Sequence, residues 1–279
     1  MMYKMVNSDI DFAFIDSGTG GIPYMLNLKK KLPQARCVYL GDTAHFPYGE
    51  KTMDEVTECA SKTIKMIVEK WNPKVLIIAC NTISVTSLAP LRQRFPSLSI
   101  VGTVPDIKLA VNVSKNKIIG LLATNATVKH PYCENLIHDF ASDCKVFSRG
   151  DPELISFIEH KLFTVTEEEK IQAVLPSVSY FKSCGCDTII LGCTHFTHIA
   201  NILSNVCGNE IQIVDSRDGV SNQAIRIMNS DLNYKHIDLK EELPEDMTFF
   251  VTKCETEKDE TEYSVLCKNF NIPWGGLLK

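Results

Sequence analysis

Two cysteines follow short apolar segments, and small polar residues come directly after each of them. Cys80 lies in ACNT (79–82) and Cys193 in GCTH (192–195). If each apolar segment is a strand and a helix begins after the cysteine, the helix dipole lowers the pKa of the thiol from about 8.5. A single cysteine of this kind is usually a buried core residue. Two in equivalent positions instead favour a pair of reactive thiols.

Each cysteine is preceded, in its own half of the chain, by another strand-end turn rich in hydroxyl groups. These turns are IDSGTGG (15–21) and ATNAT (123–127). The repetition predicts two related α/β lobes that face each other. Because ligands of open α/β sheets bind beyond the carboxyl ends of the strands, both cysteines are expected to line one cleft between the lobes.

Thiols on opposite walls of a cleft suit a reaction that inverts a carbon atom carrying a weakly acidic hydrogen. One thiolate removes the proton from one face of the carbon, and the opposite thiol returns a proton to the other face. Cysteine serves in both roles because both of its protonation states are reachable near neutral pH. Asp16, expected beside one wall, and His195, beside the other, can accept a proton or orient a thiol. This chemistry needs no redox cofactor, and we expect none.

Two glycine-containing turns are open to either a binding role or a purely structural one. The segment IDSGTGGIP lacks the third glycine of G-x-G-x-x-G, where Pro23 stands, and no Gly-Lys-Ser/Thr follows it to form a P-loop. Either its backbone N–H groups, with Asp16 and Ser17, hold a small polar ligand, or Asp16 and Ser17 cap a helix. The segment GDTAHFPYGE is either a surface loop or a loop that offers its Pro-Tyr-Gly backbone and the Tyr48 hydroxyl to a carboxylate.

Cysteines and histidines around Cys193 have the residue types of zinc ligands. The Cys-x-Cys pair, however, precedes a strand that would carry Cys193 some ~20 Å away at ~3.3 Å per residue, which is too far for one metal ion. We therefore expect no metal site, and we interpret the remaining cysteines as structural and the remaining histidines as solvated or hydrogen-bonded. The zinc candidates are Cys184, Cys186, Cys193, His195 and His198. Apart from Cys80, the remaining cysteines are Cys37, Cys59, Cys133, Cys144, Cys207, Cys254 and Cys267, and apart from His45 of the GDTAHFPYGE loop, the remaining histidines are His130, His138, His160 and His236.

The elements that would position these residues alternate along the chain. Short β-branched segments at 12–15, 37–40, 75–79, 99–102, 118–123, 188–192 and 211–214 are typical of strands in a mostly parallel α/β protein. Two capping boxes predict amphipathic helices between them. Thr52 with Glu55 begins a helix that ends near residue 71, and Thr166 with Glu169 begins one that ends near residue 181.

Composition places the chain among globular proteins. Its 279 residues are 44% hydrophobic and 23% charged, with a formal net charge of −5 and a pI near 5.8. This acidic balance disfavours nucleic acid and anionic membrane surfaces as main partners. The longest apolar runs, 75–80 and 118–123, are far shorter than the ~20 residues of a membrane helix. The N-terminal segment lacks the apolar region of a secretory signal, so we expect a cytoplasmic protein whose 11 cysteines are free thiols.

Five motifs, in this order, closely resemble those of the cofactor-independent glutamate racemases of the aspartate/glutamate racemase superfamily. They are DSGTGG (16–21), GDTAHFPYG (41–49), ACNT (79–82), the Thr-x-x-Thr of ATNAT (124–127) and LGCTHF (191–196). The resemblance implies an α/β fold with two pseudo-twofold related lobes, each a mostly parallel sheet flanked by helices, and an active site in the cleft between them. We expect the first lobe to comprise residues 1–103 and 215–279 and the second to comprise 104–214. The resemblance further implies a homodimer without cofactor or metal that converts L-glutamate to D-glutamate for bacterial peptidoglycan.

The same resemblance implies roles for individual residues. Cys80 resembles the base that acts on D-glutamate and Cys193 the base that acts on L-glutamate, while Asp16 and His195 match the assisting residues. Hydroxyl, amide and backbone groups can bind the substrate's carboxylates without a fixed cation beside the thiols. The residues that match substrate-binding positions are Ser17, Pro47, Tyr48, Gly49, Asn81, Thr82, Thr124, Thr127 and Thr194.

The chain departs from the family pattern at two places. GTVPDIK (102–108) stands where many members have Gly-Val-Ile-Glu-Pro, and TKCE (252–255) replaces a late Thr-Gly-Asp segment. The acidic segment ETEKDETEY (255–263) is interpreted as a solvated approach to a helix. Three alternatives to glutamate racemisation stay open: a racemase of aspartate or another small amino acid, an amino-acid-binding regulatory protein without catalysis, and a zinc-dependent regulator, which metal analysis of the purified protein would test.

Overall fold

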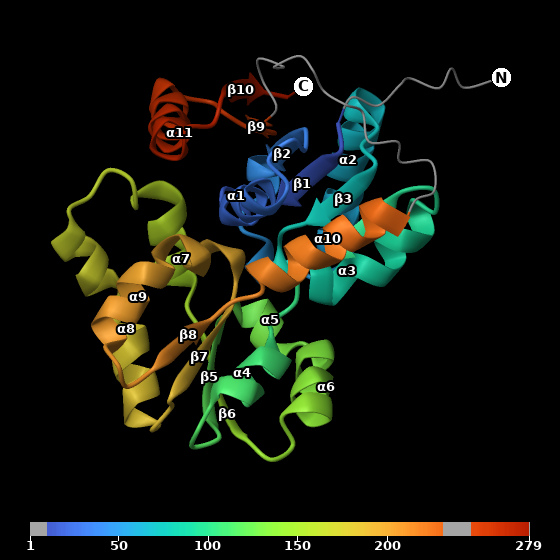
Figure 1. Ribbon diagram of the computed structural model, residues 1–279. Coiled ribbons are helices and arrows are strands. Elements are labelled where there is room, and N and C mark those ends of the chain that lie inside the picture. The colour runs from blue at the N-terminus through green and yellow to red at the C-terminus, as the bar shows by residue number, and fades with distance from the viewer. Residues whose placement is uncertain (1–9, 231–246, 279) are drawn as a thin grey trace.

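The computed structural model describes residues 10–230 and 247–278. It contains two parallel sheets, and helices cover both faces of each sheet (Figure 1). Every strand pairing in both sheets is parallel. The larger sheet has the order β10 (Trp274–Leu277), β9 (Met247–Val251), β2 (Cys37–Gly41), β1 (Phe12–Asp16), β3 (Val75–Ile78), β4 (Ser99–Gly102). The smaller sheet has the order β6 (Lys145–Gly150), β5 (Ile118–Ala123), β7 (Thr188–Gly192), β8 (Gln212–Val214).

Strand β1 lies inside the larger sheet, and its side chains alternate between two apolar cores. Phe12 and Phe14 pack with α1 (Ile22–Lys31), α10 (Arg217–Ser230) and α11 (Glu257–Phe270) on one face. Ala13 and Ile15 pack with α2 (Met53–Trp71) and α3 (Asn81–Arg94) on the other. Because successive side chains of a strand point to opposite faces, a strand covered on both sides is apolar throughout, as this one is until Asp16. The polar residue therefore marks the point where the strand leaves the core.

The smaller sheet is built in the same way. On one face lie α7 (Pro152–His160), α8 (Glu167–Ser183) and α9 (Ala200–Cys207), and on the other lie α4 (Ile107–Val113) and α6 (Pro131–Phe140). Short helical turns follow the strand ends of both sheets: η1 (Thr43–His45), η2 (Tyr48–Glu50), α5 (Asn125–Lys129) and η3 (Thr194–Ile199). These turns carry most of the residues that the sequence motifs single out.

The predicted α/β architecture and its seven strands are confirmed, with ends shifted by at most one residue. Both predicted capping boxes are present at the starts of α2 and α8. Strands β6, β9 and β10 were not predicted. The acidic segment 255–263 is expected to be a solvated approach to a helix, but only residues 255 and 256 precede α11, and residues 257–263 form its first half. The helix begins with a third capping box, formed by Thr256 and Asp259.

The two segments that depart from the family pattern have local structural roles. Asp106 of GTVPDIK caps α4, because its carboxylate accepts a hydrogen bond from the Leu109 amide. Thr252 of TKCE donates its hydroxyl to the Asp42 carboxylate at 2.8 Å, beyond the end of β2. Across the described ranges of the chain, no helix has the length and apolar character needed to cross a membrane.

Candidate active site

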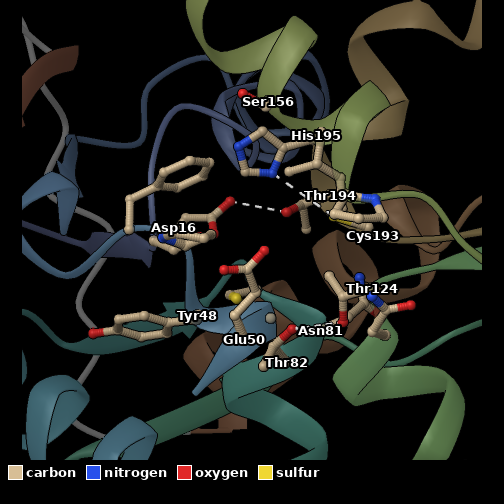
Figure 2. Close-up of a pocket in the computed structure, with 18 of the residues that line it drawn as sticks. Asp16, Tyr48, Glu50, Asn81, Thr82, Thr124, Ser156, Cys193, Thr194 and His195 are labelled. Atoms are coloured by element: carbon tan, nitrogen blue, oxygen red, sulfur yellow. Dashed lines mark hydrogen bonds between the residues drawn. The ribbon is translucent and has the colours of Figure 1, made fainter.

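Polar residues at the strand ends of both sheets line one cavity of about 320 Å³ (Figure 2). This volume lies at the lower end of the range for small-molecule sites, about 300 to 1,000 Å³. Every residue with a predicted catalytic or binding role lines this cavity except Thr127. The lining residues are Asp16, Ser17, Phe46, Pro47, Tyr48, Gly49, Glu50, Cys80, Asn81, Thr82, Thr124, Asn125, Pro152, Ile155, Ser156, His160, Cys193, Thr194 and His195.

The two cysteines reach the cavity from different sheets. Cys80 follows β3 and is the N-cap residue of α3, while Cys193 follows β7 and is the N-cap residue of η3. Both backbones are extended at the cysteine, so each chain turns directly after the thiol. Each cysteine is 5% exposed, and its exposed part faces the shared cavity. The two thiols are therefore brought to one site by the equivalent positions of their strands.

Cys80 has an acidic neighbour, and this changes the expectation for its thiol. Burial raises the pKa of Cys80 well above its usual value, and the charge of Asp16 and a hydrogen bond to it add to the rise. The predicted lowering by the helix terminus is therefore wrong for Cys80, because desolvation outweighs the hydrogen bond from the Ile83 backbone that favours the thiolate. A thiol with this environment needs a nearby proton acceptor.

Asp16 is placed to be that acceptor. Its carboxylate is fully buried and accepts hydrogen bonds from the Ser17 amide at 2.6 Å and from the Thr194 hydroxyl at 2.9 Å. Burial raises the pKa of Asp16 to about 6, although the positive charge of His195 and these hydrogen bonds act in the opposite direction. A carboxyl group with this pKa changes its protonation state close to neutral pH. Its bond to Thr194 also links the end of β1 to the end of β7.

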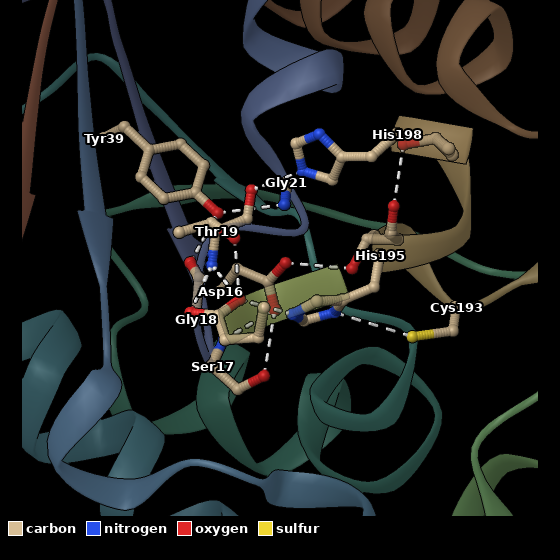
Figure 3. A network of polar contacts seen from close by, with 12 residues as sticks. Asp16, Ser17, Gly18, Thr19, Gly21, Tyr39, Cys193, His195 and His198 are labelled. Carbon is tan, nitrogen blue, oxygen red and sulfur yellow. Dashed lines mark hydrogen bonds and ion pairs between the residues drawn. The ribbon is translucent and has the colours of Figure 1, made fainter. Parts of the chain in front are cut away.

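Cys193 has a basic neighbour instead. The Nδ1 atom of His195 lies 3.7 Å from Sγ of Cys193, and its Nε2 atom lies 2.8 Å from the Glu159 carboxylate (Figure 3). Burial lowers the pKa of His195, but hydrogen bonds to Cys193 and Glu159 raise it well above its usual value. Burial has the opposite effect on a carboxyl group and raises the pKa of Glu159. The hydrogen bond and positive charge of His195, together with the hydrogen bonds from Thr19, outweigh burial and lower the pKa of Glu159 to about 2. The pair is thus a carboxylate and an imidazolium beside the thiol.

Glu159 was missed from the sequence, although a signal was present. It is 8% exposed as a residue and lies on the buried face of α7 with Leu154, Ile155 and Ile158. A carboxylate on the apolar face of an amphipathic helix is rarely buried without a partner. The residues Phe46, Glu50, Ser156 and His160 also line the cavity without having been predicted. His160, expected to be solvated or hydrogen-bonded, is exposed, and His236, for which the same was expected, lies outside the described residues.

The glycine-rich turn after β1 holds Glu159 rather than a phosphate. The Thr19 amide donates to Glu159 at 2.9 Å and the Thr19 hydroxyl donates at 2.6 Å. A Cβ atom on Gly18 would lie 2.5 Å from the Glu159 carboxylate, and one on Gly20 would lie 2.5 Å from Nδ1 of His195. Glycine is required at both positions because the backbone itself packs against the charged pair.

The alternative in which Asp16 and Ser17 cap a helix is wrong. Helix α1 begins at Ile22, its N-cap residue is Gly21, and no side chain caps it. Tyr39 fixes the turn from the neighbouring strand instead, because its hydroxyl donates to the Gly18 carbonyl and accepts from the Gly21 amide, both at 2.9 Å. The turn therefore presents Asp16 and Ser17 to the cavity.

The loop between β2 and α2 is not a simple surface loop. Tyr48 and Asp42 are buried, and the Tyr48 hydroxyl donates a short hydrogen bond to Asp42. His45 contacts the same carboxylate at 2.9 Å. The carboxylate partner of the Tyr48 hydroxyl is thus a residue of the protein, while Pro47, Tyr48 and Gly49 line the cavity.

The opposite side of the cavity carries an amide and a chain of hydroxyls. Neither side-chain polar atom of Asn81 has a hydrogen-bond partner among the described residues, although both atoms are buried. The hydroxyl oxygens of Thr82 and Thr124 lie 3.1 Å apart, and the Thr124 hydroxyl donates to the Thr127 hydroxyl at 2.9 Å. Thr127 therefore contacts Thr124 from behind the cavity wall. An unpaired buried amide beside a cavity is well suited to bind a polar ligand.

A metal site was not expected, and the side chains of the zinc alternative are separated by β7. Cys184 and Cys186 precede that strand, whereas Cys193, His195 and His198 follow it. Within residues 10–230 and 247–278, no group of three or more His, Cys, Asp or Glu side chains is arranged to hold a metal ion.

Solved structures with the same architecture are isomerases. The crystal structure of Escherichia coli glutamate racemase in complex with L-glutamate and the activator UDP-MurNAc-Ala matches with a TM-score of 0.81 and 28% sequence identity, over 96% of this chain and 98% of that chain. Glutamate racemase from Francisella tularensis in complex with D-glutamate matches with a TM-score of 0.76 and 24% identity, over 97% of each chain, which concerns the fold alone. Fold and site together define an α/β isomerase.

Sequence relatives narrow this class. Glutamate racemase of Treponema pallidum strain Nichols is 33% identical over 267 residues, which cover 96% of both chains. Glutamate racemase of Proteus mirabilis is 37% identical over 219 residues, which cover 77% of this chain and 75% of the relative. The model of the Asp/Glu/hydantoin racemase family matches residues 26–221. The chain belongs to the Asp/Glu/hydantoin racemase family.

Proposed function

We propose that this protein interconverts L- and D-glutamate by a two-base reaction between Cys80 and Cys193. The observation that carries the proposal is the position of the two thiols, which line one cavity from the ends of strands in different sheets. Each thiol has a separate ionisable neighbour, the carboxyl group of Asp16 for Cys80 and the imidazolium of His195 for Cys193. A binding protein without catalysis has no need of this arrangement.

In the direction from L to D, the Cys193 thiolate removes the α-proton and Cys80 returns a proton to the opposite face. The α C–H bond breaks as an S–H bond forms at Cys193, and the S–H bond of Cys80 breaks as the new C–H bond forms. In the reverse direction Cys80 is the base, and ionised Asp16 accepts its proton before substrate reacts. The imidazolium of His195 stabilises negative charge at Cys193 and on the reacting carbon.

Recognition of a dicarboxylic amino acid is supported by the polar groups of the cavity. The side-chain amide of Asn81, the hydroxyls of Thr82, Thr124 and Thr194, and the backbone of the Pro47–Gly49 segment are available for the two carboxylates and the ammonium group. No lysine or arginine is found among the described residues that line the cavity. The names of the sequence relatives, and the L-glutamate bound in the Escherichia coli structure, support glutamate as the substrate.

Hydrogen exchange at the α-carbon tests the reaction directly. Each enantiomer of glutamate and of aspartate is incubated with the protein in deuterated water, and the loss of the α-proton signal is followed by NMR. We expect exchange and inversion with glutamate and much slower exchange with aspartate. Exchange with aspartate alone would show that aspartate, and not glutamate, is the substrate. Calorimetric binding of glutamate without exchange would contradict the proposal that the protein is a catalyst.

The proposal includes three finer expectations: that the D-glutamate is used for peptidoglycan, that the enzyme is cytoplasmic and that it is a homodimer. Expression of the chain in a bacterium that requires external D-glutamate tests the first two, and we expect growth without the supplement. Sedimentation analysis of the purified protein tests the third. Failure to restore growth, or a monomer in the presence of glutamate, would contradict these expectations.

A further inference from the structure

His198 lies near the Cys193 side of the cavity, but it does not line it and no part of the reaction above uses it. It belongs to η3, three residues after His195. A 3₁₀-helix has about three residues per turn, so side chains three apart point in the same direction. His195 and His198 therefore face the same neighbouring segment, the turn after β1 (Figure 3).

Two aromatic side chains hold the His198 ring. Phe163, which follows α7, lies edge-to-face with a centroid distance of 5.7 Å, and Phe270, the last residue of α11, lies at 5.5 Å. Phe163 and Phe270 also contact each other at 5.5 Å. The ring is thus oriented by segments from far apart in the sequence, so its hydrogen bond has a fixed direction.

That hydrogen bond goes to the backbone of Thr19. Nε2 of His198 lies 3.0 Å from the Thr19 carbonyl oxygen. A carbonyl oxygen only accepts, so Nε2 carries the proton. The other ring nitrogen, Nδ1, is buried without a hydrogen-bond partner among the described residues. An unpaired buried nitrogen is unfavourable for stability, and a phenylalanine of similar shape would not have it.

Thr19 connects His198 to the acid–base groups. While its carbonyl accepts from His198, its amide and hydroxyl donate to Glu159, which in turn pairs with His195 beside Cys193. We propose that His198 is a positioning residue for this reaction, which fixes Thr19 so that Glu159 and His195 keep the geometry that serves Cys193. The inference rests on the proposed function.

The electrostatic surroundings agree with a neutral His198. Burial lowers the pKa of His198 to about 4, and the positive charges of His195 and Arg217 act in the same direction. Opposed to them are the hydrogen bond to Thr19 and the charge of Glu159. Near neutral pH the ring therefore acts as a donor of one hydrogen bond and does not compete with His195 for the Glu159 carboxylate.

Two substitutions separate positioning from stability. His198→Phe keeps an aromatic ring between Phe163 and Phe270 but removes the donor, and His198→Gln restores an N–H donor of similar reach. We expect His198→Phe to lower kcat about 10- to 100-fold with KM nearly unchanged, as for a small misplacement of catalytic groups. His198→Gln should recover kcat to within a few-fold, and thermal unfolding of His198→Phe should occur at the same or a higher temperature. The matched control is His138→Phe, at a side chain that is 87% exposed.

NMR titration of the His195 ring gives a readout that is independent of turnover. We expect the titration midpoint of His195 to fall in His198→Phe and to return in His198→Gln. Wild-type kcat together with an unchanged His195 titration in His198→Phe would overturn the inference, as would equal losses in both variants with lower unfolding temperatures. If wild-type protein fails to exchange the α-proton of glutamate, the proposed function fails, and the His195 titration alone then decides whether His198 positions the pair.

Discussion

The two thiols of the cavity are equivalent in position but not in surroundings. Cys80 faces the carboxyl group of Asp16, and Cys193 faces the imidazolium of His195, which Glu159 keeps protonated. One wall therefore holds a proton acceptor and the other a fixed positive charge. The reaction is symmetric for the substrate carbon, but the protein supports its two halves by different means.

Removal of either thiol should stop the reaction in both directions. Cys80→Ala and Cys193→Ala each remove one of the two proton carriers, and we expect racemisation to fall by at least about 10²- to 10⁴-fold, the usual contribution of an acid–base group. Circular dichroism of the glutamate solution measures the rate. Cys184→Ala, at a half-buried cysteine before β7, is the control and should stay nearly fully active. Full activity in either of the first two variants would refute the two-wall reaction.

The pH dependence of activity should reveal Asp16. When Asp16 and both thiols are protonated, no group can take a proton from substrate, so activity requires loss of one proton. Because the pKa of Asp16 is about 6, kcat/KM should rise as the pH increases through this value. The two enantiomers are equally stable, so both directions must share the profile. In Asp16→Asn the rise of kcat/KM should move to higher pH. An unchanged profile in that variant would show that the proton whose loss activates the enzyme belongs to a group other than Asp16.

At the scale of elements, the turn between β1 and α1 is the segment of the larger sheet's half that packs against Glu159 and His195. Its backbone touches Glu159 and His195 because Gly18 and Gly20 have no side chains. Glycine is needed here because a side chain would collide with Glu159 or His195. Backbone conformation does not require it, because neither residue has a positive φ angle. This turn is the element on which the charged pair depends most directly.

A methyl group in this turn should therefore affect activity more than folding. In Gly20→Ala the new Cβ would lie 2.5 Å from His195, so we expect the ring to be displaced and kcat to fall by about 10²-fold. Gly219→Ala in α10 is the control, since its Cβ would meet no atom closer than 3.8 Å. The control should keep its activity and gain up to about 1 kcal/mol of stability from helix propensity. Equal activity of the two variants would contradict this interpretation of the turn.

The strands and strand-end residues were predictable because their signals are local. Apolar segments of four to six residues that end in polar turns identify buried parallel strands, and the residues just beyond them line the cavity. Strand β6 was missed because KVFSRG is an edge strand with half-buried polar residues, so it lacks that pattern. Glu159 and His198 were missed as members of the site because Thr19, the residue that both of them contact, is 140 or more residues away from each of them along the chain. Such pairings follow from tertiary packing alone.

At the scale of the whole molecule, hydrogen bonds between three pairs of described residues join the end of β1 and the turn after it to the smaller sheet and its helices. They run from Thr194 to Asp16, from Thr19 to Glu159 and from His198 to Thr19. All three lie around the cavity rather than at the periphery. The contacts that hold the sheets together here are therefore the same contacts that orient the acid–base groups.

Acid should weaken the folded state through Glu159. Its pKa is lowered from 4.5 to about 2, so the stability it contributes is fully present above pH 4.5 and is lost as the pH falls toward 2. The midpoint of urea unfolding, measured between pH 2 and 6, should fall steeply over this window in the wild type. Glu159→Gln lacks this titration, so its midpoint should depend less on pH there. Parallel curves for the two proteins would exclude Glu159 as a contributor.

The bridge from Thr19 to Glu159 has a further consequence for how a turnover begins. If the halves of the molecule part to admit an amino acid, Glu159 loses its two Thr19 donors and keeps its bond to His195, so the charged pair beside Cys193 is less firmly oriented. The acid–base groups beside Cys193 would then be fully oriented only when the halves are closed around a ligand. The reaction would in this way be coupled to closure of the cavity.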